Sequence, residues 1–224
     1  MKRKIIQTAD GSSTIFIEDW DEHYHSKHGA IQEAYHVFIK MGLYHYIESQ
    51  KPENEVNVLE IGFGTGLNAF ITFLEAEKNN LSIQYDGVEG YPVSSDEVSQ
   101  LNYVELLENK GFKEQFQAMH DGPWEKYIQL SEAFRLKKRK QFFNEIDDNE
   151  VFDLIYFDAF GARVQPELWT EEIFQRMHNA LKPGGVLVTY AAKGSVRRAM
   201  IASGFSVEKL PGPPGKREML RATR

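Results

Sequence analysis

Residues 57–68 constrain the fold of this chain more than any other part of its sequence. An apolar run leads into three alternating glycines, Gly62, Gly64 and Gly66, and a segment with helical spacing follows. Glycine has no side chain and tolerates unusual backbone dihedrals, so such a turn lets a ligand lie directly against the backbone. The Lys-Ser/Thr pair of a phosphate-binding loop does not occur here. The segment therefore predicts the first unit of a nucleoside-binding α/β sheet, in which Glu60 accepts hydrogen bonds from a ligand amine or from the amides of the turn.

Further strand-like runs each end at an acidic residue, at Glu89, Asp121 and Asp158. The runs are residues 83–89, 116–121 and 151–158. Helical segments lie between them, which predicts βαβ units that build a parallel sheet. Ligands bind such sheets beyond the carboxyl ends of the strands, where these acids collect. Glu89 has the position of a carboxylate that binds ribose hydroxyls, and a surface acid at a strand end is the alternative reading.

The other elements follow from hydrophobic spacing and from capping residues. Thr170 is the expected cap of a helix. The secondary structure of residues 123–150 is not assigned, because the segment after Trp124 is amphipathic and a strand can equally begin at Phe134. The remaining elements that we expect are strands at residues 13–17, 205–210 and 218–223 and helices at residues 30–47, 67–78, 96–109 and 170–181.

The order of these elements predicts one domain with an N-terminal elaboration. Residues 1–50 precede the first strand of the predicted sheet, and we expect them to pack on the core as an extension. Residues 51–224 form the main domain, with residues 52–55 as the connector.

Composition restricts the classes of protein to which the chain can belong. The 224 residues carry a net charge of −7 and contain no cysteine, which excludes disulfides and thiolate metal sites. The N-terminus lacks a sustained apolar segment, which argues against a signal peptide or membrane span and agrees with a cytoplasmic location. Net negative charge argues against indiscriminate nucleic-acid binding. Basic clusters at residues 137–140, 197–198 and 216–217 still leave room for a directional RNA surface.

Several motifs along the chain occur in a distinctive order. They are Gly-Phe-Gly-Thr-Gly-Leu-Asn at 62–68, Val-Glu-Gly-Tyr-Pro at 88–92, Phe-Asp-Ala-Phe at 157–160, Gln-Pro-Glu-Leu-Trp at 165–169, Pro-Gly-Gly at 183–185, Val-Arg-Arg at 196–198 and Lys-Arg-Glu-Met-Leu at 216–220. This order resembles the MnmC-like methyltransferase family, the S-adenosylmethionine-dependent half of a bifunctional enzyme that makes 5-methylaminomethyl-2-thiouridine in tRNA. The resemblance runs from about residue 21 to the C-terminus.

The resemblance implies a class I methyltransferase fold. This Rossmann-like α/β architecture has helices on both faces of a mostly parallel, seven-stranded sheet with one antiparallel strand. It also implies S-adenosylmethionine as the cofactor, with no metal and no flavin in this chain. The implied cofactor-binding residues are Glu60, Gly62, Gly64, Gly66, Asn68, Glu89 and Asp121.

Each implied cofactor contact has a structural alternative. Glu60 and the glycines would surround the methionine part, or they form a structural turn with a capping acid. Asn68 contacts the ligand or caps the helix locally. Glu89 binds the ribose, and Asp121 approaches the adenine amine unless it is only the first residue of an Asp-Gly turn.

Asp158 carries the chemistry in this interpretation. Methyl transfer to an amine is an in-line displacement, so the enzyme has to place the nitrogen about 3 Å from the methyl carbon. An amine that is protonated near neutral pH has no free lone pair. A carboxylate that takes the proton and orients the nitrogen removes this obstacle. The alternative is an acid that only caps the next loop.

The implied substrate is the anticodon loop of tRNA, with its wobble uridine. A single-stranded base turns into a pocket at little unstacking cost, and aromatic side chains often stack on such bases. Phe160 has this stacking role or belongs to the core. Tyr24 matches a family tyrosine and is expected to form a pocket lid. Lys216 and Arg217 match the C-terminal motif and either contact the anticodon loop or brace the pocket.

The chain also departs from the bifunctional enzyme. Its flavin-dependent oxidase part has no counterpart here, so upstream wobble-uridine modification enzymes are expected to supply the amine. A transferase acting on a small amine such as a polyamine, and an RNA-binding module without catalysis, are the competing readings. Residues 131–150 match the family poorly. We predict no metal site at the neighbouring histidines, which lack a carboxylate-bearing helical motif, namely His23, His25 and His28.

Overall fold

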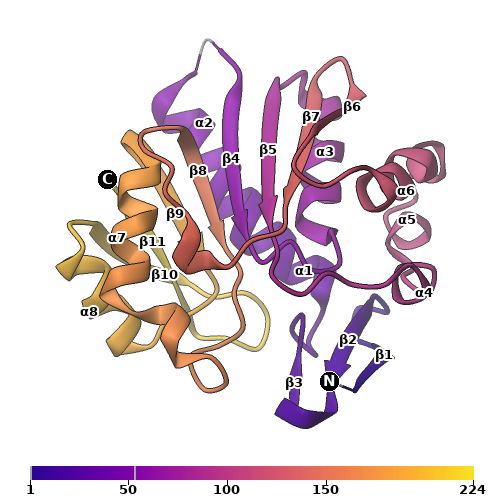
Figure 1. The fold of residues 1–224 in the computed structure, drawn as a ribbon, viewed down its shortest axis with the longest axis horizontal. Helices are drawn as coiled ribbons and strands as arrows, with labels where there is room; N and C mark the ends of the chain where they lie inside the picture. The colour runs from indigo at the N-terminus through magenta and orange to yellow at the C-terminus, as the bar shows by residue number, and fades with distance from the viewer. Residues whose placement is uncertain (1, 53) are drawn as a thin grey trace.

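The computed structural model describes residues 2–52 and 54–224, so Met1 and Glu53, one residue of the predicted connector, lie outside the described residues. Its centre is a sheet of eight strands with helices on both faces (Figure 1). The strands are β4 (Val56–Ile61), β5 (Ile83–Val88), β6 (Tyr127–Ser131), β7 (Phe134–Arg139), β8 (Phe152–Phe157), β9 (Leu181–Thr189), β10 (Ser206–Pro211) and β11 (Glu218–Thr223).

The strand order is β10-β11-β9-β8-β4-β5-β7-β6. From β4 the chain winds outward through β5 and β7, and it then returns to the other side of β4 through β8 and β9. These five strands are parallel, and β11 is antiparallel to β9. Such a reversal of winding opens a crevice beyond the carboxyl ends of the central strands. The predicted α/β class with a mostly parallel sheet is confirmed.

The sheet has one strand more than the seven that the resemblance implies. Residues 123–150, which the sequence leaves open, include an antiparallel hairpin in which β6 adds to the outer edge of β7. Phe134 and Leu136 are fully buried, whereas Arg135 and Lys137 between and beside them are not. This alternation has the period of a strand. Because the hairpin adds β6 to the sheet, the predicted count of seven strands with one antiparallel strand is wrong.

Three longer helices cover the large sheet, α3 (Leu67–Asn79), α7 (Glu171–Ala180) and α8 (Gly194–Ala202). The helices predicted at residues 67–78 and 170–181 are confirmed as α3 and α7. The hydroxyl of Thr170 accepts a hydrogen bond from the amide of Ile173 at 3.4 Å, which caps α7 as expected.

The single helix predicted at residues 96–109 is wrong. The segment forms two short helices, α4 (Ser95–Val98) and α5 (Tyr103–Leu106), with a turn between them. In this turn the side-chain oxygen of Asn102 accepts a hydrogen bond from the amide of Ser13 at 2.8 Å, and its side-chain nitrogen donates to the carbonyl of Gly11 at 2.9 Å. These contacts with the distant N-terminus replace the helical continuation that local spacing favours.

The strand predicted at residues 116–121 is also wrong, because these residues lie in a third helix of this region, α6 (Lys113–Asp121). Phe116 and Met119 are buried, and a spacing of three places them on one face of a helix. Asp121 is therefore the last residue of a helix and does not end a strand of the sheet.

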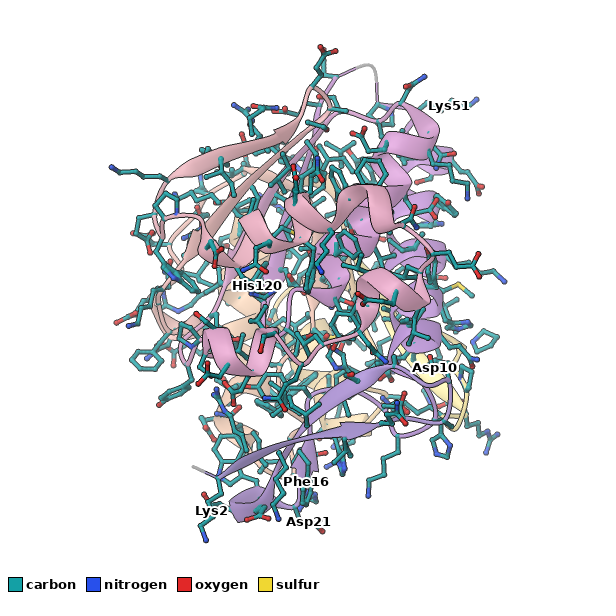
Figure 2. The ribbon with its side chains drawn as sticks, turned by 90° about the vertical axis from the view of Figure 1, so that its right-hand side faces the viewer. Lys2, Asp10, Phe16, Asp21, Lys51 and His120 are labelled. Atoms are coloured by element: carbon teal, nitrogen blue, oxygen red, sulfur yellow. The ribbon has the colours of Figure 1, made fainter. Side chains whose placement is uncertain are left out.

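Residues 2–50 begin with a small antiparallel sheet of three strands. A continuous helical stretch follows and packs against β8 and β9, as expected for residues 30–47. Figure 1 shows the small sheet beside the end of the large sheet where β4 and β5 finish. In Figure 2, Lys2, Phe16 and Asp21 accordingly lie at one end of the molecule and Lys51 at the other. The elements are β1 (Arg3–Gln7), β2 (Ser13–Ile17), β3 (Glu22–His23), α1 (Ala30–Ala34), the π-helical η2 (Tyr35–Tyr44) and α2 (His45–Gln50).

Every residue of β8 is buried, and its two ends carry acids with different surroundings. Asp153 near the start of the strand accepts hydrogen bonds from the hydroxyl of Tyr46 at 3.0 Å and from the amide of Asn57 at 2.8 Å. The ammonium group of Lys182 lies 2.9 Å from the same carboxylate. Asp153 thus joins α2, β4 and β9 at the end of the sheet away from the crevice.

We expect Asp153→Ala to lower the free energy of unfolding by about 2–3 kcal/mol, because the amide of Asn57 and the hydroxyl of Tyr46 lose their acceptor. Asp147→Ala is the control, since Asp147 is exposed and its loss should change stability by less than about 0.5 kcal/mol. Urea denaturation measures both. A loss at position 153 no larger than that of the control would contradict a stabilising role.

Candidate functional site

A cavity of about 460 Å³ lies at the carboxyl ends of β4, β5 and β8. The small N-terminal sheet contributes a second wall through residues 20–25. The predicted site residues that line the cavity are Tyr24, Gly62, Gly64, Asn68, Glu89, Asp158 and Phe160. Those that do not line it are Glu60, Gly66, Asp121, Lys216 and Arg217.

The glycine turn is pressed between the end of β8 and the N-terminal wall. Gly62 has a φ of 93°, and a Cβ at this position would lie 2.8 Å from the carbonyl oxygen of Asp158. Gly64 has a φ of 49°, and a Cβ there would lie 3.1 Å from the ring of Tyr24. At both positions the backbone dihedral and the close approach of other protein atoms require glycine.

Glu89, directly after β5, is fixed by the backbone around it. One carboxylate oxygen accepts a hydrogen bond from the amide of Gly64 at 2.9 Å, and the other accepts from the amide of Tyr91 at 2.8 Å. Burial raises the pKa of Glu89, and these two backbone hydrogen bonds oppose that effect. The acid therefore connects the glycine turn of β4 with the loop after β5.

Asn68, in the first turn of α3, joins the fully buried acid Glu60 and the partly buried acid Asp158. Its side-chain nitrogen donates to a carboxylate oxygen of Glu60 at 2.9 Å and to one of Asp158 at 2.8 Å. Burial raises the pKa of both acids well above the ordinary range, and the hydrogen bond from Asn68 opposes this shift in each. Glu60 also interacts with the buried hydroxyl of Tyr85, whose hydrogen bond opposes the rise in the pKa of Glu60. The side-chain oxygen of Asn68 is buried without a hydrogen-bond partner among the described residues.

The loop after β8 is held in place by two donors from other parts of the chain. The indole N–H of Trp169 donates to the carbonyl of Phe160 at 2.7 Å, and the hydroxyl of Tyr190 donates to the carbonyl of Ala159 at 2.8 Å. The ring of Phe160 meets Tyr24 edge-on at 4.9 Å and Trp20 at 5.4 Å between centroids. Phe160 is therefore part of an aromatic wall that faces the cavity.

Aromatic residues at the rim were missed by the sequence analysis. Tyr91 and Phe142 line the cavity, are 54% and 49% exposed, and meet edge to face at 5.7 Å. Tyr91 lies two residues after Glu89, the acid that follows β5, which is a signal that sequence inspection can use. Phe142 follows β7, and without that strand assignment its position was not predictable.

The predicted residues outside the cavity have other surroundings. Asp121 is exposed and accepts a hydrogen bond from the side chain of Gln117 at 2.9 Å, so the structure does not bring it to the other site residues. Gly66, with a φ of 72°, precedes α3 and packs against the ring of His120. Lys216 forms an ion pair with Glu33, whereas the neighbouring Arg217 is exposed.

His25 in the N-terminal wall is a buried neutral side chain. One ring nitrogen lies 3.0 Å from the hydroxyl of Thr14, and burial lowers the pKa of His25 to about 4. Within residues 2–52 and 54–224, no group of His, Cys, Asp or Glu side chains could hold a metal ion. No helix in this described part is long and apolar enough to cross a membrane.

Comparison with known proteins identifies relatives of the whole chain. A family model described as S-adenosyl-L-methionine-dependent methyltransferase matches residues 124–224. The tRNA 5-methylaminomethyl-2-thiouridine biosynthesis bifunctional protein MnmC of Leptospira interrogans is 31% identical over 214 residues, which are 91% of this chain and 32% of that protein. Over nearly its whole length the chain is similar to the methyltransferase part of MnmC-like proteins.

Other similar proteins and structures agree with this likeness. The MnmC protein of Pseudomonas entomophila is 28% identical over 90% of the chain and 32% of its own length, so the chain spans about a third of the curated relatives it matches. The crystal structure of MnmC2 from Aquifex aeolicus has a TM-score of 0.79 and 25% identity, covering 99% of this chain and 69% of that one. A probable spermidine synthase from Corynebacterium glutamicum shares the fold, with a TM-score of 0.56 and 19% identity over 99% of this chain and 76% of that one.

The chemistry of the cavity fits the cofactor of this family. S-adenosylmethionine carries an ammonium, a sulfonium and a ribose diol, and carboxylates favour all three. Asn68, Glu89 and Asp158 line the cavity, and Glu60, outside the lining, accepts a hydrogen bond from Asn68. Buried polar atoms of native proteins nearly always have partners, so the unpartnered side-chain oxygen of Asn68 fits a donor such as an ammonium group.

We expect Gly62→Ala to lower the free energy of unfolding by about 1–3 kcal/mol and to weaken S-adenosylmethionine binding, because the new Cβ meets the Asp158 carbonyl at a positive φ. Gly111→Ala is the matched control, since no heavy atom lies within 4 Å of its Cβ position. Calorimetric titration and denaturation measure the two effects. Wild-type binding and stability in Gly62→Ala would show that the turn tolerates a side chain.

Proposed function

We propose that this protein transfers a methyl group from S-adenosylmethionine to the aminomethyl nitrogen of 5-aminomethyl-(2-thio)uridine at the wobble position of tRNA. The partly buried carboxylate of Asp158 at the tip of the central strand β8, facing the cavity, carries the proposal. The names of the MnmC relatives supply the substrate class. Residues 51–224 constitute the methyltransferase domain in this proposal, and residues 1–50 are an extension that completes the cavity.

The residues that hold the cofactor in this proposal surround the end of β4. The glycine turn admits the backbone contact, Glu60 and Asn68 bind the ammonium group, and Glu89 binds the ribose diol. The cofactor supplies an electrophilic methyl group on a sulfonium, which is a good leaving group already. The protein therefore has to orient the amine and keep the reaction out of water.

Asp158 acts on the proton of the incoming amine. The carboxylate accepts a proton from the substrate ammonium, and the freed lone pair forms the nitrogen–carbon bond as the sulfur–carbon bond breaks. Asn68 and the loop around Ala159 hold the carboxylate in one orientation. Because burial raises the pKa of Asp158, its carboxylate is a stronger base than an exposed one.

The substrate side of the cavity is aromatic in this proposal. Tyr24, Phe160 and Trp20 present ring edges and faces that suit a turned-out base. Arg217, which is exposed in the loop between β10 and β11, contacts phosphate groups of the anticodon loop in this proposal. The wobble-uridine modification enzymes that act earlier supply the amine.

Nucleoside mass spectrometry of tRNA tests the proposed reaction. The tRNA is purified from a strain that lacks the protein and incubated with the protein and labelled S-adenosylmethionine. We expect 5-aminomethyl-(2-thio)uridine to disappear and the labelled methylaminomethyl nucleoside to appear. An unchanged nucleoside profile, or faster turnover on polyamines than on tRNA, would reject the proposal.

We expect Asp158→Asn to lower kcat by roughly 10²–10⁴-fold with S-adenosylmethionine binding largely retained, because the amide keeps the shape and cannot accept the amine proton. Asp147→Asn, which changes an exposed acid outside the cavity, should leave kcat unchanged. Steady-state kinetics and calorimetric titration give the two quantities. An equal loss of cofactor binding in Asp158→Asn would make the role of the acid structural.

A further inference from the structure

Lys216 is enclosed by groups of its own protein although it lies in the loop between β10 and β11. Its ammonium group forms an ion pair with Glu33 of α1. The same ammonium lies 3.9 Å from the centroid of the Tyr190 ring, a distance typical of a cation–π contact. The side chain of Lys216 is 31% exposed and that of Glu33 only 9%. Lys216 is not part of the cavity lining, whereas Tyr190 is.

The loop that carries Lys216 is anchored to the N-terminal segment. Gly215 packs directly on the ring of His28, so that a Cβ at this position would overlap the imidazole. A ring nitrogen of His36 lies 2.8 Å from the carbonyl oxygen of Pro211. These contacts hold Lys216 in place, unlike the exposed side chain of Arg217 next to it.

Lys216 reaches the catalytic loop through Tyr190. The ring of Tyr190 contacts the ammonium group, and its hydroxyl donates to the carbonyl of Ala159 at 2.8 Å. Ala159 directly follows Asp158 in the chain. The partner acid, Glu33, is itself oriented by the amide of Ser26, which donates to its other oxygen at 2.9 Å.

We propose that Lys216 is a positioning residue for Asp158, which compensates the cluster of buried acids and holds Tyr190 against the catalytic loop, and that it does not contact tRNA. The inference rests on the proposed function, because it concerns the base of that reaction. It replaces the substrate-binding role that the sequence suggests for Lys216 and keeps that role for Arg217.

The charges around Asp158 explain why a cation is needed there. Burial is the largest cause that raises the pKa of Asp158, Glu33 raises it further, and Asn68 and Lys216 lower it. The groups that interact with Asp158 in the described structure are Glu33, Glu60, Asn68, Tyr85, Tyr190 and Lys216. Lys216 is the cation among them. Without its charge, the protonated carboxyl is favoured and cannot act as a base.

Infrared difference spectroscopy tests this inference without any substrate. The difference between each protein and the same protein carrying Asp158→Asn isolates the carboxyl band of Asp158, and its pH dependence shows where this group ionises. We expect Lys216→Met to move the ionisation to higher pH and Glu33→Gln to move it to lower pH. Lys216→Arg keeps the charge and should resemble the wild type. Unmoved titrations in both charge-removing variants would overturn the inference.

Kinetics on tRNA separate positioning from RNA contact. We expect Lys216→Met to lower kcat at neutral pH by about tenfold and to move the acidic limb of kcat/KM to higher pH, with the KM for tRNA within about twofold. Arg217→Met is the matched control and should raise the KM and reduce the salt slope by roughly 1, with the pH limb unmoved. A raised KM and an unmoved limb in Lys216→Met would make Lys216 an RNA contact and overturn the inference.

Failure of the proposed function and failure of the inference about Lys216 give different results. A wild-type protein that does not methylate tRNA rejects the proposed function, while the infrared titration still decides the role of Lys216. Thermal melting checks the fold of each variant. If Lys216→Met does not fold, the titration of Glu33→Gln against Lys216→Arg decides in its place.

Discussion

The hydrogen bonds of Asn68 are the interaction on which the site depends. One amide nitrogen bridges Glu60 on β4 and Asp158 at the end of β8, at 2.9 and 2.8 Å. The bridge fixes the tips of two adjacent parallel strands relative to the first turn of α3. Because both acids are at least partly buried, this neutral donor opposes the rise in their pKa without adding a charge that would compete with a cationic ligand.

The cavity and its surroundings are rich in acids, and three kinds of group interact with these acids. Backbone amides hold Glu89, the Asn68 amide holds Glu60 and Asp158, and the Lys216 ammonium offsets Glu33. Glu89 and Asp158 leave carboxylate character at the cavity wall. An acid-rich cleft suits a cofactor with an ammonium and a sulfonium and a substrate that arrives as an amine.

The small N-terminal sheet makes the cavity a product of the whole chain. Arg163, in the loop beyond β8, donates hydrogen bonds to the carbonyls of Trp20 and Asp21 and pairs with Glu22 at 2.9 Å. Arg3 donates to the carbonyl of Tyr91 at 3.0 Å, on the side of Glu89. These two arginines attach the sheet at both sides of the cleft, so the N-terminal residues and the strand tips form one site.

The amino-acid pattern was enough to predict the α/β class, the glycine turn and the strand-end acids Glu89 and Asp158, because backbone dihedrals and hydrophobic period are local properties. Features that depend on contacts between distant segments became visible only in the folded chain. The N-terminus interrupts the helix predicted at residues 96–109 through Asn102, and burial of Phe116 and Met119 makes a helix of the run ending at Asp121. Lys216 and Arg217 look equivalent in sequence, yet a buried acid 183 residues away holds one while solvent surrounds the other. The local sequence pattern determines which secondary-structure element carries a side chain, and packing across the fold determines which groups that side chain contacts.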